Sequence, residues 1–296
     1  MDFNNVLFVG NDINSINKGH YSWKKLLREL IRKFTNNKIE KAPNEKKPFP
    51  LLYEEIYQYA LEHGNSKGKI EKYIAKNISK IQPNEIHKKI INSRYKNIIT
   101  TNYDFTLERV DNRIPDGRKR KGDVLEYIYS IFRRYKNSSS EIWHIHGDSN
   151  YPNSIMLGLK EYGDYLEKII RYIDEGPNYA HLKKPNMRWR LKSNNFNIYS
   201  WVDLFFSKNI HILGYSFDFV EYHLWWLIIA RIRMMQNVRL GNRIFYYYPV
   251  ELKSKIKHKL QVFKAYMVEP IAIQGYENNK KSKIEYYSKI LDRISS

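Results

Sequence analysis

Apolar residues follow two spacings along the chain, and together these predict an α/β fold. Short continuous apolar or β-branched runs are typical of strands buried on both faces. These runs are Val6–Val9, Asn97–Thr101, Glu141–Ile145, Ser154–Leu157, Ile210–Leu213, Ile244–Tyr248 and Tyr266–Ile271. Helical spacing predicts helices over Ser22–Phe34, Leu51–Glu62, Ile70–Ile81, Pro83–Tyr95, Glu161–Ile173, Ile198–Phe206, a segment ending at Met235, Leu252–Phe263 and Lys280–Ile294. Strands separated by helices favour a Rossmann-like, doubly wound and mostly parallel sheet.

The order of these elements predicts one domain over residues 1–296 with two additions. The segment of about 35–95 begins with a proline-punctuated polar stretch and holds helical patterns without a strand, so we expect a helical insertion. Residues of about 236–296 form a C-terminal α/β extension. We expect loops at Asp111–Asp123, which is rich in Gly and charge, and at Glu175–Lys192.

Composition narrows the possible sites and partners. The chain has no cysteine, which excludes disulfides and cysteine-based zinc sites. The net charge of +20 is compatible with nucleic acid as a secondary partner, but the lysines are scattered, and the run Arg118–Lys121 fits a solvated loop. No signal peptide or apolar run long enough for a membrane span is evident, so we expect a cytoplasmic protein without a membrane partner.

Polar or turn-forming clusters follow four of the predicted strands. In open α/β sheets, ligands bind beyond the carboxyl ends of the strands, so these clusters should surround one pocket. The clusters are Gly10-Asn11-Asp12 with Ser15, Thr100-Thr101-Asn102-Tyr103-Asp104, His146-Gly147-Asp148, and Gly214-Tyr215-Ser216-Phe217-Asp218.

In their order, these motifs resemble the sirtuin-like NAD hydrolases of bacterial antiphage defence. The similarity includes the segment Tyr21–Leu27 and runs over about residues 5–235, with Thr100–Asp104 as its most specific piece. The resemblance implies a Rossmann-like fold that binds NAD as its substrate. It places Asn102 and Asp104 near the nicotinamide ribose and makes His146 a base, and these three are the predicted catalytic residues. The predicted cofactor-binding residues are Gly10, Asn11, Asp12, Ser15, Trp23, Thr101, Gly214, Ser216 and Asp218.

The residue types suit cleavage of the nicotinamide–ribose bond. An oxocarbenium-like transition state is stabilised by a nearby anion or polar oxygen, and a histidine can accept a proton from water or a ribose hydroxyl. Asn102 would orient the water or the ribose, and Ser216 would bind a ribose or phosphate oxygen. Protein-deacetylating sirtuins carry a four-cysteine zinc module, so its absence here favours hydrolysis by water, and no zinc is expected.

Two observations leave alternatives open. The first turn, Gly10-Asn11-Asp12, has side chains where the family often has Gly-Ala-Gly, which hinders approach of a pyrophosphate. Asn102 and Asp104 could instead cap a helix beginning near Phe105.

Further residues have plausible structural roles. Asp218 and Glu221 could reach the pocket, or could favour the start of the following helix through its dipole, which we prefer. His144 and His146 have a spacing compatible with a metal pair, but we expect no metal site and give His144 a packing role. We expect structural roles for His211 and His223. The stripe around Trp225 and Trp226 indicates a helix core or a subunit interface.

The leading hypothesis is therefore an NAD glycohydrolase that depletes NAD in abortive infection. The resemblance implies a homo-oligomer whose trigger is oligomerisation or a partner, such as a defence ATPase or a phage component. One alternative is a metal-dependent nuclease or phosphoesterase, suggested by Gly10-Asn11-Asp12, His144-Ile145-His146 and the net positive charge. The other is a non-catalytic nucleotide- or DNA-binding module.

Overall fold

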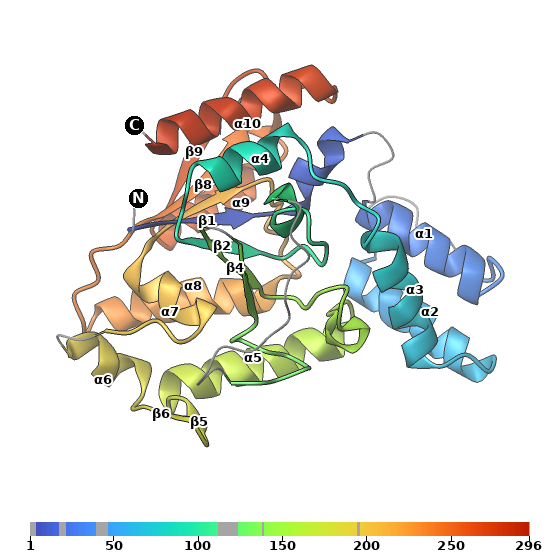
Figure 1. Cartoon of the computed structure of the whole chain (residues 1–296), viewed down its shortest axis with the longest axis horizontal. Coiled ribbons are helices and arrows are strands. Elements are labelled where there is room, and N and C mark those ends of the chain that lie inside the picture. The colour runs from blue at the N-terminus through green and yellow to red at the C-terminus, as the bar shows by residue number, and fades with distance from the viewer. Residues whose placement is uncertain are drawn as a thin grey trace.

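A central, mostly parallel sheet organises the chain (Figure 1). The computed structural model describes residues 4–17, 22–39, 47–111, 124–137, 139–193 and 196–295. Within these residues, seven strands lie in the order β3-β4-β2-β1-β7-β8-β9. Their bounds are β1 (Asn5–Val9), β2 (Asn97–Thr100), β3 (Arg134–Lys136), β4 (Glu141–His144), β7 (Asn209–Leu213), β8 (Ile244–Pro249) and β9 (Val268–Ile273). Only β3, at one edge, pairs antiparallel, so the predicted fold class is confirmed.

The parallel strands have the connectivity of a dinucleotide-binding sheet. Numbered one to six along the chain, they lie in the order 3-2-1-4-5-6, which is the doubly wound Rossmann order. This order reverses between β1 and β7, whose last residues Val9 and Leu213 are paired in register. Ligands bind such sheets in the crevice beyond the strand ends at this switch point.

Helices cover both faces of the sheet (Figure 1). The α-helices are α1 (Trp23–Phe34), α2 (Phe49–Glu62), α3 (Lys67–Ile78), α4 (Glu85–Asn92), α5 (Leu159–Asp174), α6 (Met187–Lys192), α7 (Trp201–Ser207), α8 (Tyr222–Met235), α9 (Lys257–Ala265) and α10 (Lys280–Ser295). Short 3₁₀ helices are η1 (Asn11–Ile16), η2 (Glu108–Asp111), η3 (Pro152–Ser154) and η4 (Val250–Leu252). Alternate residues of β1 face opposite cores: Val6 and Phe8 pack with α5, α7, α8 and α9, whereas Leu7 and Val9 pack with α4 and α10.

Helices α1, α2 and α3 form a separate hydrophobic cluster beside the sheet (Figure 1). Helix α1 begins as the sequence predicts, because the Ser22 side chain accepts a hydrogen bond from the Lys25 amide at 3.2 Å. Its buried positions Leu26, Leu30 and Ile31 lie on one face, toward α2 and α3. Helix α4, although it falls within the predicted insertion, packs against α10 over the sheet. The laterally placed unit is therefore α1–α3.

Three details differ from the predicted elements. The strand predicted at Ser154–Leu157 is wrong, because Pro152–Ser154 forms η3 and Ile155–Leu157 joins no ladder. The apolar side chains of Ile155 and Leu157 pack instead into the α1–α3 cluster. The region predicted as irregular contains α6 and a hairpin of β5 (Asn178–Tyr179) and β6 (Leu182–Lys183). The polar edge strand β3 was also not predicted.

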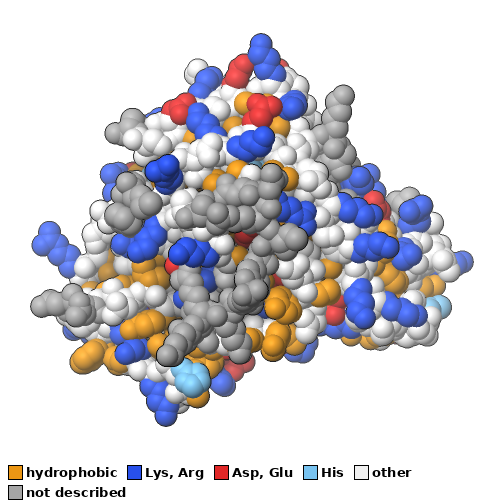
Figure 2. Space-filling model, viewed as in Figure 1, with side chains coloured by type: hydrophobic (Ala, Val, Ile, Leu, Met, Phe, Trp, Pro, Cys, Tyr) orange, Lys and Arg blue, Asp and Glu red, His pale blue; other side chains and the backbone are white. Residues whose placement is uncertain are grey.

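On the face of the molecule that Figure 2 shows, the basic side chains are spread rather than concentrated. Figure 2 shows Lys and Arg side chains over the whole visible face, among neutral and apolar ones. The basic run Arg118–Lys121 lies outside the described residues. Among the described helices, none combines the length and the apolar character that crossing a membrane requires.

Candidate functional site

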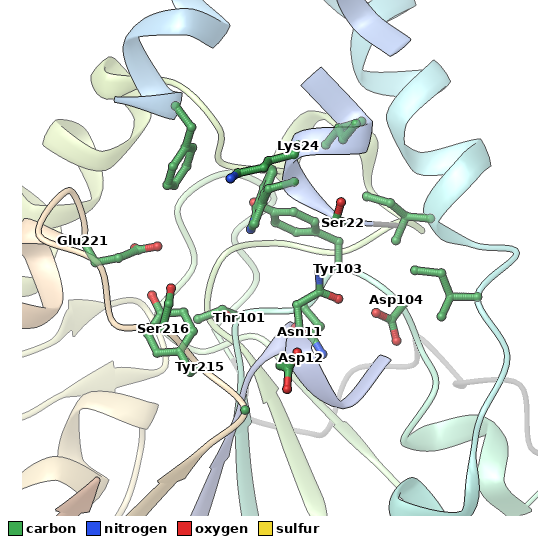
Figure 3. Close-up of a pocket in the computed structure, with 17 residues that line it drawn as sticks. Asn11, Asp12, Ser22, Lys24, Thr101, Tyr103, Asp104, Tyr215, Ser216 and Glu221 are labelled. Carbon is green, nitrogen blue, oxygen red and sulfur yellow. The ribbon is translucent and has the colours of Figure 1, made fainter. Parts of the chain in front are cut away.

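A cavity of about 490 Å³ opens beyond the carboxyl ends of β1, β2 and β7 (Figure 3). Its volume is within the range usual for small-molecule sites. The strand-end turns line one side. The other side is lined by residues of α1, the start of α2 and the end of α3. The lining residues are Asn11, Asp12, Ser22, Trp23, Lys24, Leu26, Phe49, Ile78, Ile81, Thr101, Asn102, Tyr103, Asp104, Gly214, Tyr215, Ser216 and Glu221.

The turns after β1 and β7 are joined at the base of the cavity. The Gly10 amide donates to Leu213 O at 3.0 Å, and the Asp12 amide donates to Gly214 O at 2.9 Å. A Cβ on Gly10 would lie 2.4 Å from Gly214 O, so only glycine fits there. Gly10 therefore does not line the cavity itself but sets the approach of the two turns.

Asp12 is fixed by residues from the C-terminal part of the chain. Its Oδ2 accepts hydrogen bonds from the hydroxyls of Tyr276, at 2.8 Å, and Tyr287, at 2.5 Å. Lys283 Nζ lies 3.5 Å from Asp12 Oδ1 and donates to Ser15 Oγ at 2.5 Å. Ser15 does not line the cavity but supports Asp12, because its hydroxyl donates to Asp12 Oδ1 at 3.0 Å.

The turn after β2 places Asn102 and Asp104 on the cavity wall. The Asn102 amide N–H donates to Thr100 Oγ1 at 3.0 Å, while the buried side-chain Oδ1 has no hydrogen-bond partner among the described residues. Asp104 is already paired, because its carboxylate accepts from Asn14 Nδ2 at 2.8 Å and from the Thr106 amide at 3.0 Å. Asp104 thus holds the turn, and Asn102 offers a free acceptor.

His146 lies behind the cavity wall and does not line the cavity. Its side chain is 2 % exposed, and its Nε2 is 2.9 Å from Nε2 of His223. Burial lowers the pKa of His146 to about 3, so the imidazole is uncharged near neutral pH. The next residue, Gly147, has φ +94°, and a Cβ there would lie 2.0 Å from Ser154 O. The turn that places His146 therefore needs this glycine.

Glu221 stands between His146 and the cavity. It occupies the N-cap position of α8, but its side chain makes no capping bond, and Figure 3 shows its carboxyl group directed into the cavity. Its Oε2 lies 3.8 Å from His146 Nε2 and 3.9 Å from His223 Nε2. Burial raises the pKa of Glu221 to about 8, against a smaller lowering by Tyr215. Sequence reasoning gave Glu221 a role at the helix start, because helix N-termini commonly carry acidic residues.

These three side chains form the group that could hold a metal ion within the described residues. The ligand atoms of His146, Glu221 and His223 all lie within 4.8 Å of one another. His144 takes no part, since its Nε2 contacts Glu108 Oε1 at 2.8 Å and its Nδ1 contacts Asn102 O at 3.0 Å. The two histidines of the His144-Ile145-His146 motif therefore have separate partners.

The turn after β7 contributes Gly214, Tyr215 and Ser216 to the wall. The carbonyl oxygen of Ser216 accepts from Lys259 Nζ at 2.8 Å and from the Tyr246 hydroxyl at 3.2 Å. Asp218 does not line the cavity; its carboxylate accepts from the Phe219 amide at 2.8 Å.

The opposite wall is aromatic and carries one lysine. Trp23 stacks on Phe49, with ring centroids 5.4 Å apart, and meets the edge of Tyr103 at 5.6 Å. Lys24 is the cationic side chain among the lining residues, which also include the carboxyl groups of Asp12, Asp104 and Glu221. Sequence reasoning missed Phe49, because nothing in the pattern near it signals a pocket, and it chose Trp23 but not its neighbour Lys24 from the segment Tyr21–Leu27.

The predicted site residues thus fall into two groups. Those that line the cavity are Asn11, Asp12, Trp23, Thr101, Asn102, Asp104, Gly214 and Ser216. Those placed behind or beside it are Gly10, Ser15, His146 and Asp218.

Comparison with known families agrees with the motifs. The model of the SIR2-like domain matches residues 96–271, from just before β2 into β9. This range holds Asn102, His146, Ser216 and Glu221, and it covers more than half of the chain. A search of curated proteins found no match. The sirtuin-like character predicted from the motifs is confirmed, and the chain belongs to the SIR2-like domain family.

Proposed function

We propose that this chain hydrolyses NAD at the nicotinamide–ribose bond and releases nicotinamide and ADP-ribose. The SIR2-like domain fits an NAD-related function. The observation that carries the proposal is the unpartnered Asn102 Oδ1 on the wall of a cavity at the switch point of a Rossmann sheet. A buried oxygen without a partner is costly unless a ligand satisfies it.

The charges of the cavity suit the two ends of NAD. The nicotinamide ring is cationic, and its loss leaves positive charge on the ribose, which a polar oxygen on the cavity wall, such as Asn102 Oδ1, stabilises. The diphosphate is anionic and would lie toward Lys24 and the turn at Asn11. The stacked pair Trp23 and Phe49 offers an aromatic surface for a base.

The reacting water needs an orienting group and a proton acceptor. We assign orientation to Asn102. Because His146 does not line the cavity and its pKa is about 3, we propose Glu221, which lines the cavity and has a pKa of about 8, as the proton acceptor. His146, whose Nε2 is 3.8 Å from Glu221 Oε2, is then a positioning residue behind it. We also propose that residues 1–296 act as one domain, since α1–α3 supply the aromatic wall.

The direct test incubates the purified chain with NAD and measures the released nicotinamide by chromatography. Because the resemblance implies activation by assembly, the assay spans low to high protein concentration. We expect release by the wild type that persists with chelator and is lost in Asn102→Ala and His146→Ala. Asn150→Ala, an exposed asparagine away from the cavity, is the matched control. Intact NAD at every concentration, or full activity of Asn102→Ala, would contradict the proposal.

We further propose that NAD cleavage serves antiphage defence through a homo-oligomer triggered by assembly or by a partner such as an ATPase or a phage component. The motif resemblance supports this role. We expect cellular NAD to fall after phage infection in cells expressing the wild type and to stay constant with Asn102→Ala. Equal NAD levels in the two infected cultures would argue against it.

A further inference from the structure

His146, Glu221 and His223 form a small triangle of potential ligand atoms directly behind the cavity wall. The distances between these atoms are 2.9 Å for the two Nε2 atoms, 3.8 Å from Glu221 Oε2 to His146, and 3.9 Å from Glu221 Oε2 to His223. All three side chains are buried, and Glu221 Oε2 has no hydrogen-bond partner among the described residues. A buried carboxyl oxygen without a partner is costly, and a bound cation would satisfy it.

The size of the triangle matches one class of ion. The point equidistant from its three corners lies about 2 Å from each, which is the length of Zn–N and Zn–O bonds. Calcium bonds are longer, at about 2.3–2.6 Å, and both calcium and magnesium prefer oxygen donors. Two imidazole nitrogens with one carboxylate favour zinc or a similar transition metal.

The position of Glu221 gives such an ion access and an open coordination site. Glu221 lines the cavity, so an ion can reach the triangle from that side. Three protein ligands leave a position for water, and a tetrahedral arrangement requires the two imidazole nitrogens to move apart from 2.9 Å, because ligands about 2 Å from a tetrahedral ion lie about 3.3 Å from one another. The lack of cysteine excludes only thiolate zinc sites, and the imidazoles, which lie 77 positions apart in the sequence, form no recognisable metal motif.

We propose that His146, Glu221 and His223 bind one zinc-class divalent cation at the back of the cavity. Without the ion the two Nε2 atoms share a hydrogen bond, so one of them carries a proton. On binding, that proton would move to Nδ1 of the same ring and Glu221 would release its proton to solvent, which leaves both Nε2 lone pairs and the Glu221 carboxylate as ligands. If the chain cleaves NAD as proposed, zinc bound at this site inhibits the cleavage. That consequence rests on the proposed function, whereas zinc binding itself does not.

Calorimetric titration of the full chain with zinc chloride, without NAD, tests the site. We expect one tight zinc per chain, and magnesium in large excess should not compete. His223→Gln and Glu221→Gln should each weaken this binding by more than about tenfold. His211→Gln, a buried histidine on β7 that contacts the Tyr247 hydroxyl, is the matched control and should bind like the wild type. Circular dichroism verifies the fold of each variant.

Cobalt(II) substitution reports on the site in the unaltered chain and so does not depend on any variant folding. We expect the visible absorption of four-coordinate cobalt at one ion per chain, displaced by zinc. Absence of saturable zinc binding, or equal binding by wild type and both cluster variants, would overturn the proposal. Nicotinamide release measured separately, without zinc, shows whether the proposed function itself fails.

Discussion

The amide of Asp12 donates a hydrogen bond to the carbonyl oxygen of Gly214 across 2.9 Å, joining the turns after β1 and β7. These turns flank the point where the strand order reverses, and both line the cavity. The contact depends on Gly10, where a Cβ would collide with the same carbonyl. The base of the cavity is thus set by a backbone contact between residues about two hundred positions apart.

Gly10→Ala should therefore destabilise the fold by about 1–3 kcal/mol, because backbone atoms must move to admit the methyl group. Urea unfolding measures the loss. Gly68→Ala is the matched control: it lies near the start of α3 with no atom near the added Cβ, so its stability should stay equal or rise. Equal stability of Gly10→Ala and the wild type would contradict the close approach.

Tyr287→Phe tests the support of Asp12 by the C-terminal segment. The change removes one of two hydroxyl donors to Asp12 Oδ2 and should cost about 1 kcal/mol of stability. We also expect weaker NAD binding, since Asp12 lines the cavity. Calorimetric titration with NAD compares the affinity of Tyr287→Phe with that of Tyr127→Phe. Tyr127 is an exposed residue away from the cavity. Identical NAD affinity in the two variants would show that this support does not matter for the site.

Acid should destabilise the protein through His87, a buried histidine on α4. Burial lowers its folded pKa to about 4 from an ordinary value of 6.5. Between these values the unfolded chain binds a proton that the folded chain does not. Stability is therefore full above about pH 6.5 and falls as pH drops toward 4, by up to roughly 3 kcal/mol for this group.

The variant His87→Gln isolates this effect. Glutamine can retain the acceptor that His87 Nδ1 offers to the Asn84 amide at 3.1 Å, but it does not titrate. Urea unfolding at several pH values should show a shallower loss of stability below pH 6.5 in the variant. Parallel pH curves for wild type and variant would contradict the assignment.

Lys24→Ala tests where the diphosphate lies. Removal of the cationic side chain from the cavity wall should raise KM for NAD several-fold, by about 1 kcal/mol of binding energy, and leave kcat nearly unchanged. Lys25→Ala, an exposed neighbour outside the cavity, is the control. An unchanged KM in Lys24→Ala would place the phosphates elsewhere.

The sequence predicts the sheet well because strands buried on both faces are continuously apolar. Val6–Val9 has no polar position, Ile210–Leu213 has only His211, and each run ends in a glycine turn. It predicts the three-residue edge strand β3 poorly, because Arg134 and Lys136 look like loop residues. The apolar run Ile155–Leu157 was misread as a strand because burial against helices produces the same pattern.

The site could be predicted only where it lies at strand ends. Asn102 and Ser216 follow from their positions after β2 and β7. Phe49 comes from the neighbouring helical cluster, and the pairing of His146 with His223 joins a strand-end turn to α8. Neither arrangement leaves a periodic signal, since each depends on how separate elements pack. For the same reason, the position of His146 behind Glu221 follows from tertiary structure alone.

A crystal structure of Asn102→Ala with saturating NAD tests the central claim most directly. We expect NAD in the cavity, with the nicotinamide ribose beside residue 102 and Glu221, and the diphosphate toward Lys24 and Asn11. An empty cavity, or NAD bound elsewhere on the chain, would contradict the assignment of this cavity as an NAD site.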